Sequence, residues 1–236
     1  LAVVLGAVGR VLPAERRTFG LGLVTAAGAA GQFTILPFGQ ALMTAGIEWL
    51  PALLILATGS IIIVLCGFPL AGRPDIRGAA KTVVENDLGL SGALREASKH
   101  RGYWLLTLGF FVCGFHVAFV GVHLPAHLTD LGMSEEWRAW SLALIGIFNV
   151  IGSFTAGFLG DRFRKKNLIT ILYFTRSAVI LIFIMVPVSP VSVILFSASL
   201  GLLWLSTVPL TSGLVAQMFG PRYMGTLFGI VFLNHQ

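Results

Sequence analysis

Long apolar runs separated by short polar connectors make up most of this chain. A membrane-spanning helix needs about 20 apolar residues to cross about 30 Å of hydrocarbon. Five runs reach that length, at residues 18–40, 50–70, 103–125, 139–160 and 168–186. Residues 177–221 carry no charge and are too many for one crossing, and Pro187 and Pro190 divide them. The pattern therefore predicts one more span at 191–217.

These spans are predicted to be helices, because membrane β-strands would alternate apolar and polar residues over short segments. Two further apolar runs, at residues 1–8 and 225–236, are too short to cross. We expect them to be ends of helices in a protein that extends beyond this sequence in both directions.

Positive charge alternates from one connector to the next. All but two of the 16 lysines and arginines lie in the odd-numbered connectors, at residues 9–17, 71–101, 161–167 and 219–224. The positive-inside rule places these connectors in the cytosol. The long connector 71–101 mixes both charges with glycine and alanine, and we expect a short amphipathic helix in it, on the membrane surface.

Composition supports a membrane protein. Mean hydropathy is +0.89 and 11% of residues are charged, whereas a soluble domain has about 25%. The net charge of +6 lies in the connectors, so it indicates topology rather than nucleic-acid binding. Cys66 and Cys113 lie in apolar runs and form neither a disulfide framework nor a metal pattern. No phosphate-binding glycine-rich motif is present, and no cofactor is expected.

The segment from Gly157 to Lys166, with the sequence GFLGDRFRKK, resembles the short cytosolic signature of the major facilitator superfamily. Arg164 departs from it, because the family usually has glycine there. The segment 13–17 before a glycine-rich helix resembles the family's loop between the fourth and fifth helices. More faintly, residues 31–33 and 228–236 are similar to the monocarboxylate and oxalate–formate branch.

This resemblance implies an all-α polytopic bundle of two pseudo-symmetric halves, covered from the end of helix four into helix eleven. Residues 1–70 would be the last part of the first half, from the end of helix four through helix six. Residues 71–101 would be the central cytosolic loop, and 102–236 would hold helices seven to ten and the start of eleven. We expect a monomer that binds a small-molecule substrate and no nucleic acid. It would lie in the lipid bilayer of the plasma membrane, which in a bacterium is the inner membrane.

The resemblance also implies a gating motif at the cytosolic surface, formed by Gly157, Asp161, Arg162, Lys165 and Lys166. Asp161 would pair with a cation across the two halves or with a neighbouring helix end, and its release would let the halves rock. The plainer interpretation is a helix end with positive-inside charges. An acidic group at a helix C-terminus gains nothing from the helix dipole, which favours the gating role for Asp161.

Arg176 is the charge that lies well inside a span, roughly 12 Å from the cytosolic start of its helix. An intramembrane arginine is by default a functional candidate and suits an anionic substrate. Alternatively, because side chains point toward the helix N-terminus, Arg176 could extend back to the cytosolic surface.

The predicted seventh helix carries Cys113, His116, His123 and His127 on one face. Spacings of seven and four could suggest a metal site, but no acidic residue joins them and Pro125 interrupts the last turn, so no metal is predicted. His116 lies near mid-membrane and is a candidate ligand for substrate or a proton. His123 and His127 are expected at the outer interface.

Other polar residues fall at mid-membrane depth, where they must face protein or a water-filled cavity. Some will hydrogen-bond between helices, the commoner role of Ser and Thr. The candidate cavity-lining residues are Asn149, Trp204, Thr207, Thr211 and His235.

The leading hypothesis is a secondary transporter working by alternating access, with a small organic anion such as a monocarboxylate as substrate and possible coupling to a proton or counter-solute. An efflux carrier of drugs or other hydrophobic solutes is the alternative. More remote is an intramembrane enzyme using the helix-seven histidines, and the chain is not expected to be an enzyme, because acids or cysteines converging at their depth are missing.

Overall fold

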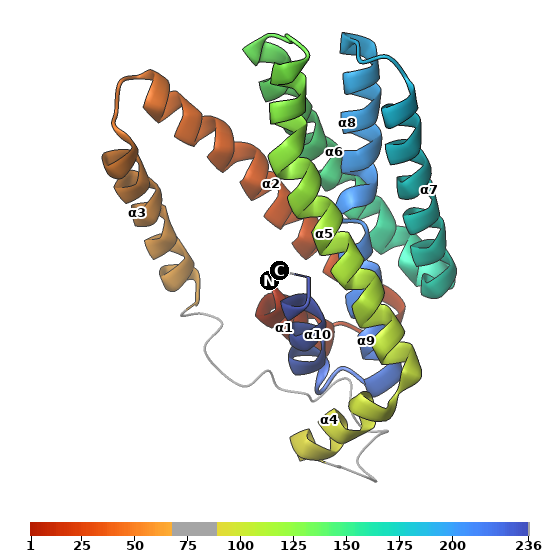
Figure 1. Cartoon of the computed structure of the whole chain (residues 1–236). Coiled ribbons are helices and arrows are strands. Elements are labelled where there is room, and N and C mark those ends of the chain that lie inside the picture. Colours follow the sequence, from red (N-terminus) through yellow and green to blue (C-terminus); the bar gives the residue numbers. More distant parts are fainter. Residues whose placement is uncertain (68–88, 236) are drawn as a thin grey trace.

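The computed structural model describes residues 1–67 and 89–235, and within these residues it is helical with no strand (Figure 1). A short 3-10 turn at Ala14–Arg16 joins the first two helices. The helices in chain order are α1 (Ala2–Val11), α2 (Arg17–Thr44), α3 (Trp49–Gly67), α4 (Gly89–Lys99), α5 (Arg101–Asp130), α6 (Glu135–Arg162), α7 (Lys165–Met185), α8 (Pro190–Trp204), α9 (Thr207–Phe219) and α10 (Met224–Leu233).

The predicted spans are confirmed as helices as far as the structure describes them, which for the span at 50–70 is up to Gly67, with two differences. Among the described residues, four helical segments are long and apolar enough to cross a membrane, and the last is Pro190–Phe219. That segment was predicted as one helix, but it is divided into α8 and α9. The helix predicted to end at Pro125 runs on to Asp130, and the Thr129 hydroxyl donates to the Pro125 carbonyl, at 2.9 Å.

The expected amphipathic helix of the long connector is α4. Ala93 and Ala97 are its buried residues, while most of its other residues are exposed. It is tied to α5, since the Trp104 indole N–H donates to the Ser98 carbonyl at 2.7 Å. The rest of that connector up to residue 88, with Arg73, Arg77 and Lys81, lies outside the described residues, as do the side chain of Cys66 and Gln236.

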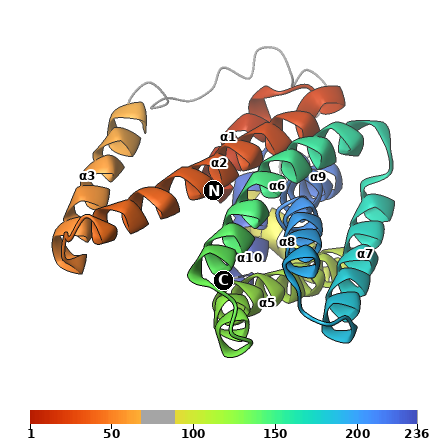
Figure 2. The ribbon, with the colours of Figure 1, turned by 90° about the horizontal axis from the view of Figure 1, so that it is seen from above.

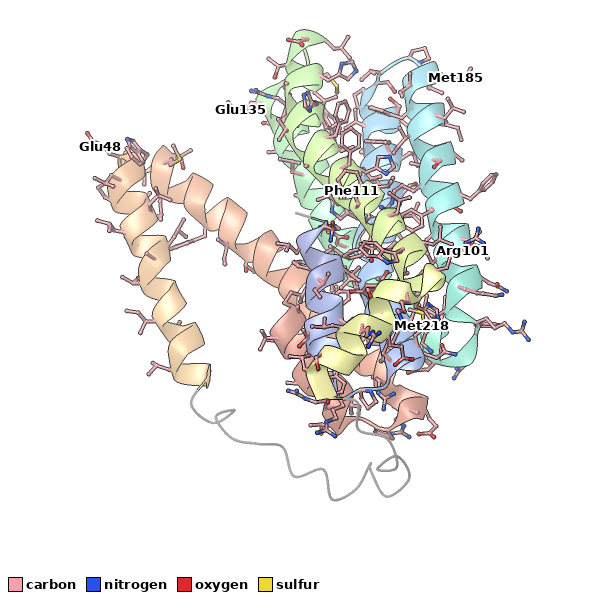
Figure 3. All side chains as sticks on the ribbon, turned by 60° about the horizontal axis from the view of Figure 1, so that its bottom comes forward. Glu48, Arg101, Phe111, Glu135, Met185 and Met218 are labelled. Carbon is pink, nitrogen blue, oxygen red and sulfur yellow. The ribbon has the colours of Figure 1, made fainter. Side chains whose placement is uncertain are left out.

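The turns lie at two opposite ends of the bundle. The turns that follow α2, α5 and α7 lie at one end, and α4 lies at the other with the turns that follow α6 and α9 (Figure 1). Figure 3 shows the same division, with Glu48, Glu135 and Met185 at one end and Arg101 and Met218 at the other. This grouping agrees with the predicted topology, and we call the end with α4 the cytosolic end.

At the cytosolic end, helices pack closely where glycines face each other. A Cβ added to Gly22 of α2 would lie 2.7 Å from the Cα of Gly157 of α6, and one added to Gly6 of α1 would lie 2.7 Å from the Cα of Gly225 of α10. Small residues let membrane helices approach so closely. Toward the outer end, α2 leans away and carries α3 with it (Figures 1 and 2), and a Cβ on Gly28 would meet nothing within 4 Å.

Three clusters of buried apolar side chains lie in the described interior, and the smallest joins Ala156 of α6, Ile169 of α7 and Leu210 of α9. The cytosolic cluster joins α1 and α2 to the later helices through Leu5, Leu21, Phe110, Val208, Val215 and Leu227. The outer cluster joins α5, α6 and α8 through Val120, Leu128, Ile145, Val193, Leu200 and Trp204. The buried side chains of α8 and α9 therefore lie in different clusters, while Leu205 between them packs against both.

The contact between Gly22 and Gly157 predicts opposite effects of one substitution at two sites of α2. Gly22→Ala places a methyl group against the backbone of α6, which cannot move aside, and overpacking of this kind costs about 1–3 kcal/mol. Gly28→Ala meets open space and should stabilise the helix by about 0.5–1 kcal/mol. SDS-induced unfolding of the full-length protein measures both, and equal effects of the two substitutions would contradict the close packing.

Candidate functional site

The interruption between α8 and α9 lies at mid-height in the bundle, and most of the predicted site residues gather around it. Leu205 and Ser206 separate the two helices and keep right-handed helical dihedrals. The predicted span at 191–217 is confirmed as one segment long and apolar enough to cross a membrane, and its helix is interrupted at this point. Because hydrocarbon offers no water to unpaired backbone groups, such a break must be satisfied by neighbouring helices.

Pro209 explains where the break falls. Proline has no amide hydrogen and its ring clashes with the carbonyl four residues earlier, which here belongs to Leu205. The amide of Val208 bonds instead to the Leu205 carbonyl at 3.0 Å, three residues back. The Trp204 carbonyl therefore loses the partner that a regular helix would give it.

Arg176 of α7 supplies the missing donors. Its guanidinium Nη2 donates to the Trp204 carbonyl at 2.8 Å and to the Leu203 carbonyl, and Nη1 donates to Cys113 Sγ of α5 at 3.0 Å. The side chain is 1% exposed, so it does not extend back to the cytosolic surface. Its Nε has no hydrogen-bond partner among the described residues.

Asn149 of α6 holds the other side of the break. Its Oδ1 accepts from the amide of Leu205 at 2.9 Å, and the residue is 1% exposed. Gly152, one turn further along α6, lets the break come close, because a Cβ there would lie 2.0 Å from the Leu202 carbonyl and 2.7 Å from Ser206 Oγ. Asn149 is therefore bonded to protein backbone here.

The remaining residues of helix ten differ in their surroundings. Thr207 lies inside the polar group, 3.4 Å from Cys113 Sγ and donating to the Trp204 carbonyl at 3.3 Å. The side chain of Trp204 packs in the outer apolar cluster. Thr211 is buried and its hydroxyl has no hydrogen-bond partner in the described part of the chain.

The four histidines singled out from the sequence, out of five in the chain, divide into two pairs. His116 is half-buried one turn from Cys113, and its Nδ1 is buried without a hydrogen-bond partner among the described residues. The ring of His235 packs on Phe110, with centroids 4.6 Å apart, and its backbone lies against Gly114 of α5. His123 and His127 are exposed. Within the described residues no group of three His, Cys, Asp or Glu could hold a metal ion.

At the cytosolic end, Asp161 binds the start of α2. Its Oδ1 accepts from the amide of Thr18 at 2.9 Å and its Oδ2 from the amide of Phe19 at 2.8 Å. These amides are among the first N–H groups of α2, which have no partner within their own helix, and the positive end of the helix dipole favours the carboxylate. Of the two partners expected for Asp161, the structure shows the helix end.

The rest of the predicted motif surrounds this contact. Gly157 faces Gly22, and the Arg162 guanidinium lies 4.0 Å from the ring centroid of Phe158. Lys165 is half-buried beside Gly213 of α9, while Lys166 is exposed. The motif thus brings α2, α6, α7 and α9 together at one end.

The polar group at the break carries positive charge without a matching acid. Arg176 is held by carbonyls and a thiol, and no carboxylate pairs with it among the described residues. An uncompensated buried cation creates a potential that attracts anions. Sequence reasoning missed Cys113 as part of this group, although its place one turn before His116 was a usable signal. Nothing in the sequence around Gly152 indicated that this residue would contact the break.

Comparison with known proteins gives one family and several relatives. The family model described as Major Facilitator Superfamily matches residues 1–236. Monocarboxylate transporter 12 of Rattus norvegicus is 24% identical over 94% of this chain and 51% of its own length, and monocarboxylate transporter 13 of Bos taurus is 26% identical over 92% and 50%. The uncharacterized MFS-type transporter YcxA of Bacillus subtilis is 28% identical over 61% of this chain and 38% of its own. The chain therefore spans about half the length of these relatives, or less.

The bond from Leu205 to Asn149 predicts a specific loss of stability. Asn149→Leu leaves the Leu205 amide buried and unpaired, which costs about 1–3 kcal/mol. We expect a lower melting temperature for the full-length protein in detergent, by about 2–4 °C for each kcal/mol. Asn167→Leu, at an exposed position of α7, is the matched control, and equal melting temperatures of the two variants would contradict the role of Asn149.

Proposed function

The chain belongs to the major facilitator superfamily, and we propose that the whole protein is a secondary transporter that moves a small solute by alternating access. The contact of Asp161 with the first amides of α2 carries this proposal. It joins a helix of the predicted second half to a helix of the predicted first half, at the cytosolic end, with two charge-assisted hydrogen bonds.

The arrangement of the helices supports the same cycle. Glycine contacts close the cytosolic end between α2 and α6 and between α1 and α10, while α2 and α3 diverge from the other helices at the outer end (Figures 1 and 2). This is the arrangement of a carrier closed to the cytosol. Release of Asp161 from α2 would let the cytosolic ends separate.

A small organic anion such as a monocarboxylate is the proposed substrate. The relatives named as monocarboxylate transporters support it, and so does the buried charge of Arg176, which no described carboxylate neutralises. His116, half-buried with a free Nδ1, is the candidate to bind the solute or a coupled proton. A plasma-membrane location, in a bacterium the inner membrane, completes the proposal, and the long apolar helices support a place in a membrane.

Uptake by the full-length protein in liposomes tests the substrate class. We expect saturable uptake of labelled small carboxylates, and an inward proton gradient should change the uptake rate. The His116→Ala variant should take up the same carboxylates with a higher KM. His127→Ala is the matched control, since His127 is exposed on the same helix. A neutral sugar and a cationic dye serve as competing solutes. Transport of the dye without carboxylate uptake would favour a drug efflux carrier and overturn the anion proposal.

The gating role of Asp161 has its own test. Asp161→Asn loses the negative charge and one acceptor, and hydrogen bonds to charged groups contribute about 1.5–3 kcal/mol. A change of that size shifts the balance between closed and open cytosolic ends by about tenfold or more. Spin labels at Arg16 and Phe163, both exposed, should report a longer distance in this variant. Asp130→Asn, at the outer end of α5, should leave the distance unchanged, and no change in either variant would contradict the gate.

A further inference from the structure

The two pieces of helix ten belong to different parts of the bundle. The side chains of α8 lie in the outer cluster, with α5 and α6. Val208 and Val215 of α9 lie in the cytosolic cluster, with Leu5 of α1 and Leu21 of α2. If the end of α8 is fixed to its neighbours, α9 can move with the cytosolic cluster while α8 stays in place in the outer cluster.

The outer side of the break is held from three helices. Arg176 bonds the carbonyls at the end of α8 and the thiol of Cys113, and Asn149 bonds the amide of Leu205. Gly201 of α8 also packs on the backbone of Ile145, since a Cβ there would lie 2.5 Å from the Ile145 carbonyl. The end of α8 is therefore fixed to α5, α6 and α7.

The start of α9 borders a crevice, at whose edge Leu210 packs with Ala156 of α6 and Ile169 of α7. This apolar crevice of about 170 Å³ borders the break between α6 and α7. It is lined by Gly152, Ala156, Leu168, Leu172, Ser206 and Leu210, among others. Leu210 thus faces the crevice, and it also packs at Gly160 beside Thr18 of α2. A tilt of α9 into the crevice would move Leu210 and Gly213 relative to Thr18, where Asp161 binds α2.

We propose that Leu205 and Ser206 form a hinge of the transport cycle, that Arg176 and Asn149 are the positioning residues that fix its outer side, and that α9 tilts into the crevice when the cytosolic end opens. This rests on the proposed alternating access but goes beyond it. A rigid half would keep all its internal distances through the cycle, whereas the hinge changes the distance between α9 and α6.

Spin-label distances in the full-length protein test the hinge, with labels introduced on non-cysteine amino acids. One pair, Phe163 and Gln217, joins the cytosolic ends of α6 and α9, and a second, Trp140 and Val191, joins the outer ends of α6 and α8. All four positions are exposed. When Asp161→Asn opens the cytosolic end, the α6–α9 pair should show a second population at a different distance. The α6–α8 pair should keep a single distance.

Filling the crevice supplies a second test. Ala156→Leu in the Asp161→Asn background should remove the second distance of the α6–α9 pair, because α9 has no space to enter. Ala139→Leu, at an exposed position on the same helix, should leave it in place. Loss of the second distance with both substitutions, or with neither, would overturn the role of the crevice.

The positioning role of Arg176 is tested by Arg176→Lys, which keeps the charge but replaces the planar fork of N–H donors with a compact ammonium on a flexible stem. The distance distribution between α6 and α9 should broaden severalfold in this variant. Ser177→Ala is the control and should keep a narrow distribution, because the Ser177 hydroxyl donates within its own helix. An unchanged distribution would show that Arg176 acts through its charge alone.

The outcomes separate the hinge from the gate. A single, unchanged distance between α6 and α9 while the Arg16–Phe163 distance lengthens would overturn the hinge and leave alternating access by rigid halves. If the Arg16–Phe163 distance also stays constant in Asp161→Asn, the gate and the hinge are both wrong.

Discussion

The lack of water inside a membrane is the constraint on which this structure depends. Every backbone amide and carbonyl at that depth needs a partner within the protein, and helix ten releases several of them where Pro209 interrupts it. Arg176 and Asn149 take up these groups, and Gly152 and Gly201 bring the neighbouring backbones near enough. The break, the buried charge of Arg176 and the two glycines therefore depend on one another, because together they pair the backbone groups that the break releases.

The same constraint explains how a guanidinium can lie buried with no carboxylate beside it among the described residues. Burial of an unpaired charge is costly, but Arg176 has two carbonyls and a thiol within hydrogen-bond distance and the face of Tyr173 at 5.5 Å. These partners are neutral, so both terminal nitrogens of the guanidinium are hydrogen-bonded while its charge persists. A cation compensated in this way can hold the backbone and still attract an anion, which a salt bridge to an acid would prevent.

Most of the fold could be predicted from the sequence, because the length of the apolar runs and the alternation of charge are local properties. The break could not. Pro209 alone does not decide it, since prolines are tolerated in membrane helices when neighbours satisfy the freed groups. The deciding neighbours, Asn149 and Arg176, lie on other helices, 56 and 28 positions away from their backbone partners. For the same reason the direction of Arg176 stayed open between the bundle interior and the cytosolic surface. The partner of Asp161 also stayed open, between a cation and a helix end, although its short motif placed it at the cytosolic surface.

Relative strength decides which of these contacts can open during a cycle. Asp161 holds α2 by two hydrogen bonds at a partly buried position, and water can replace them when the cytosolic ends part, so their net contribution stays near a few kcal/mol. The bonds of Arg176 and Asn149 lie in the dry interior, where a lost partner leaves a buried charge or amide unpaired. The contact at the membrane surface should therefore yield first, while the bonds at mid-membrane persist and define the point about which the cytosolic piece of helix ten turns.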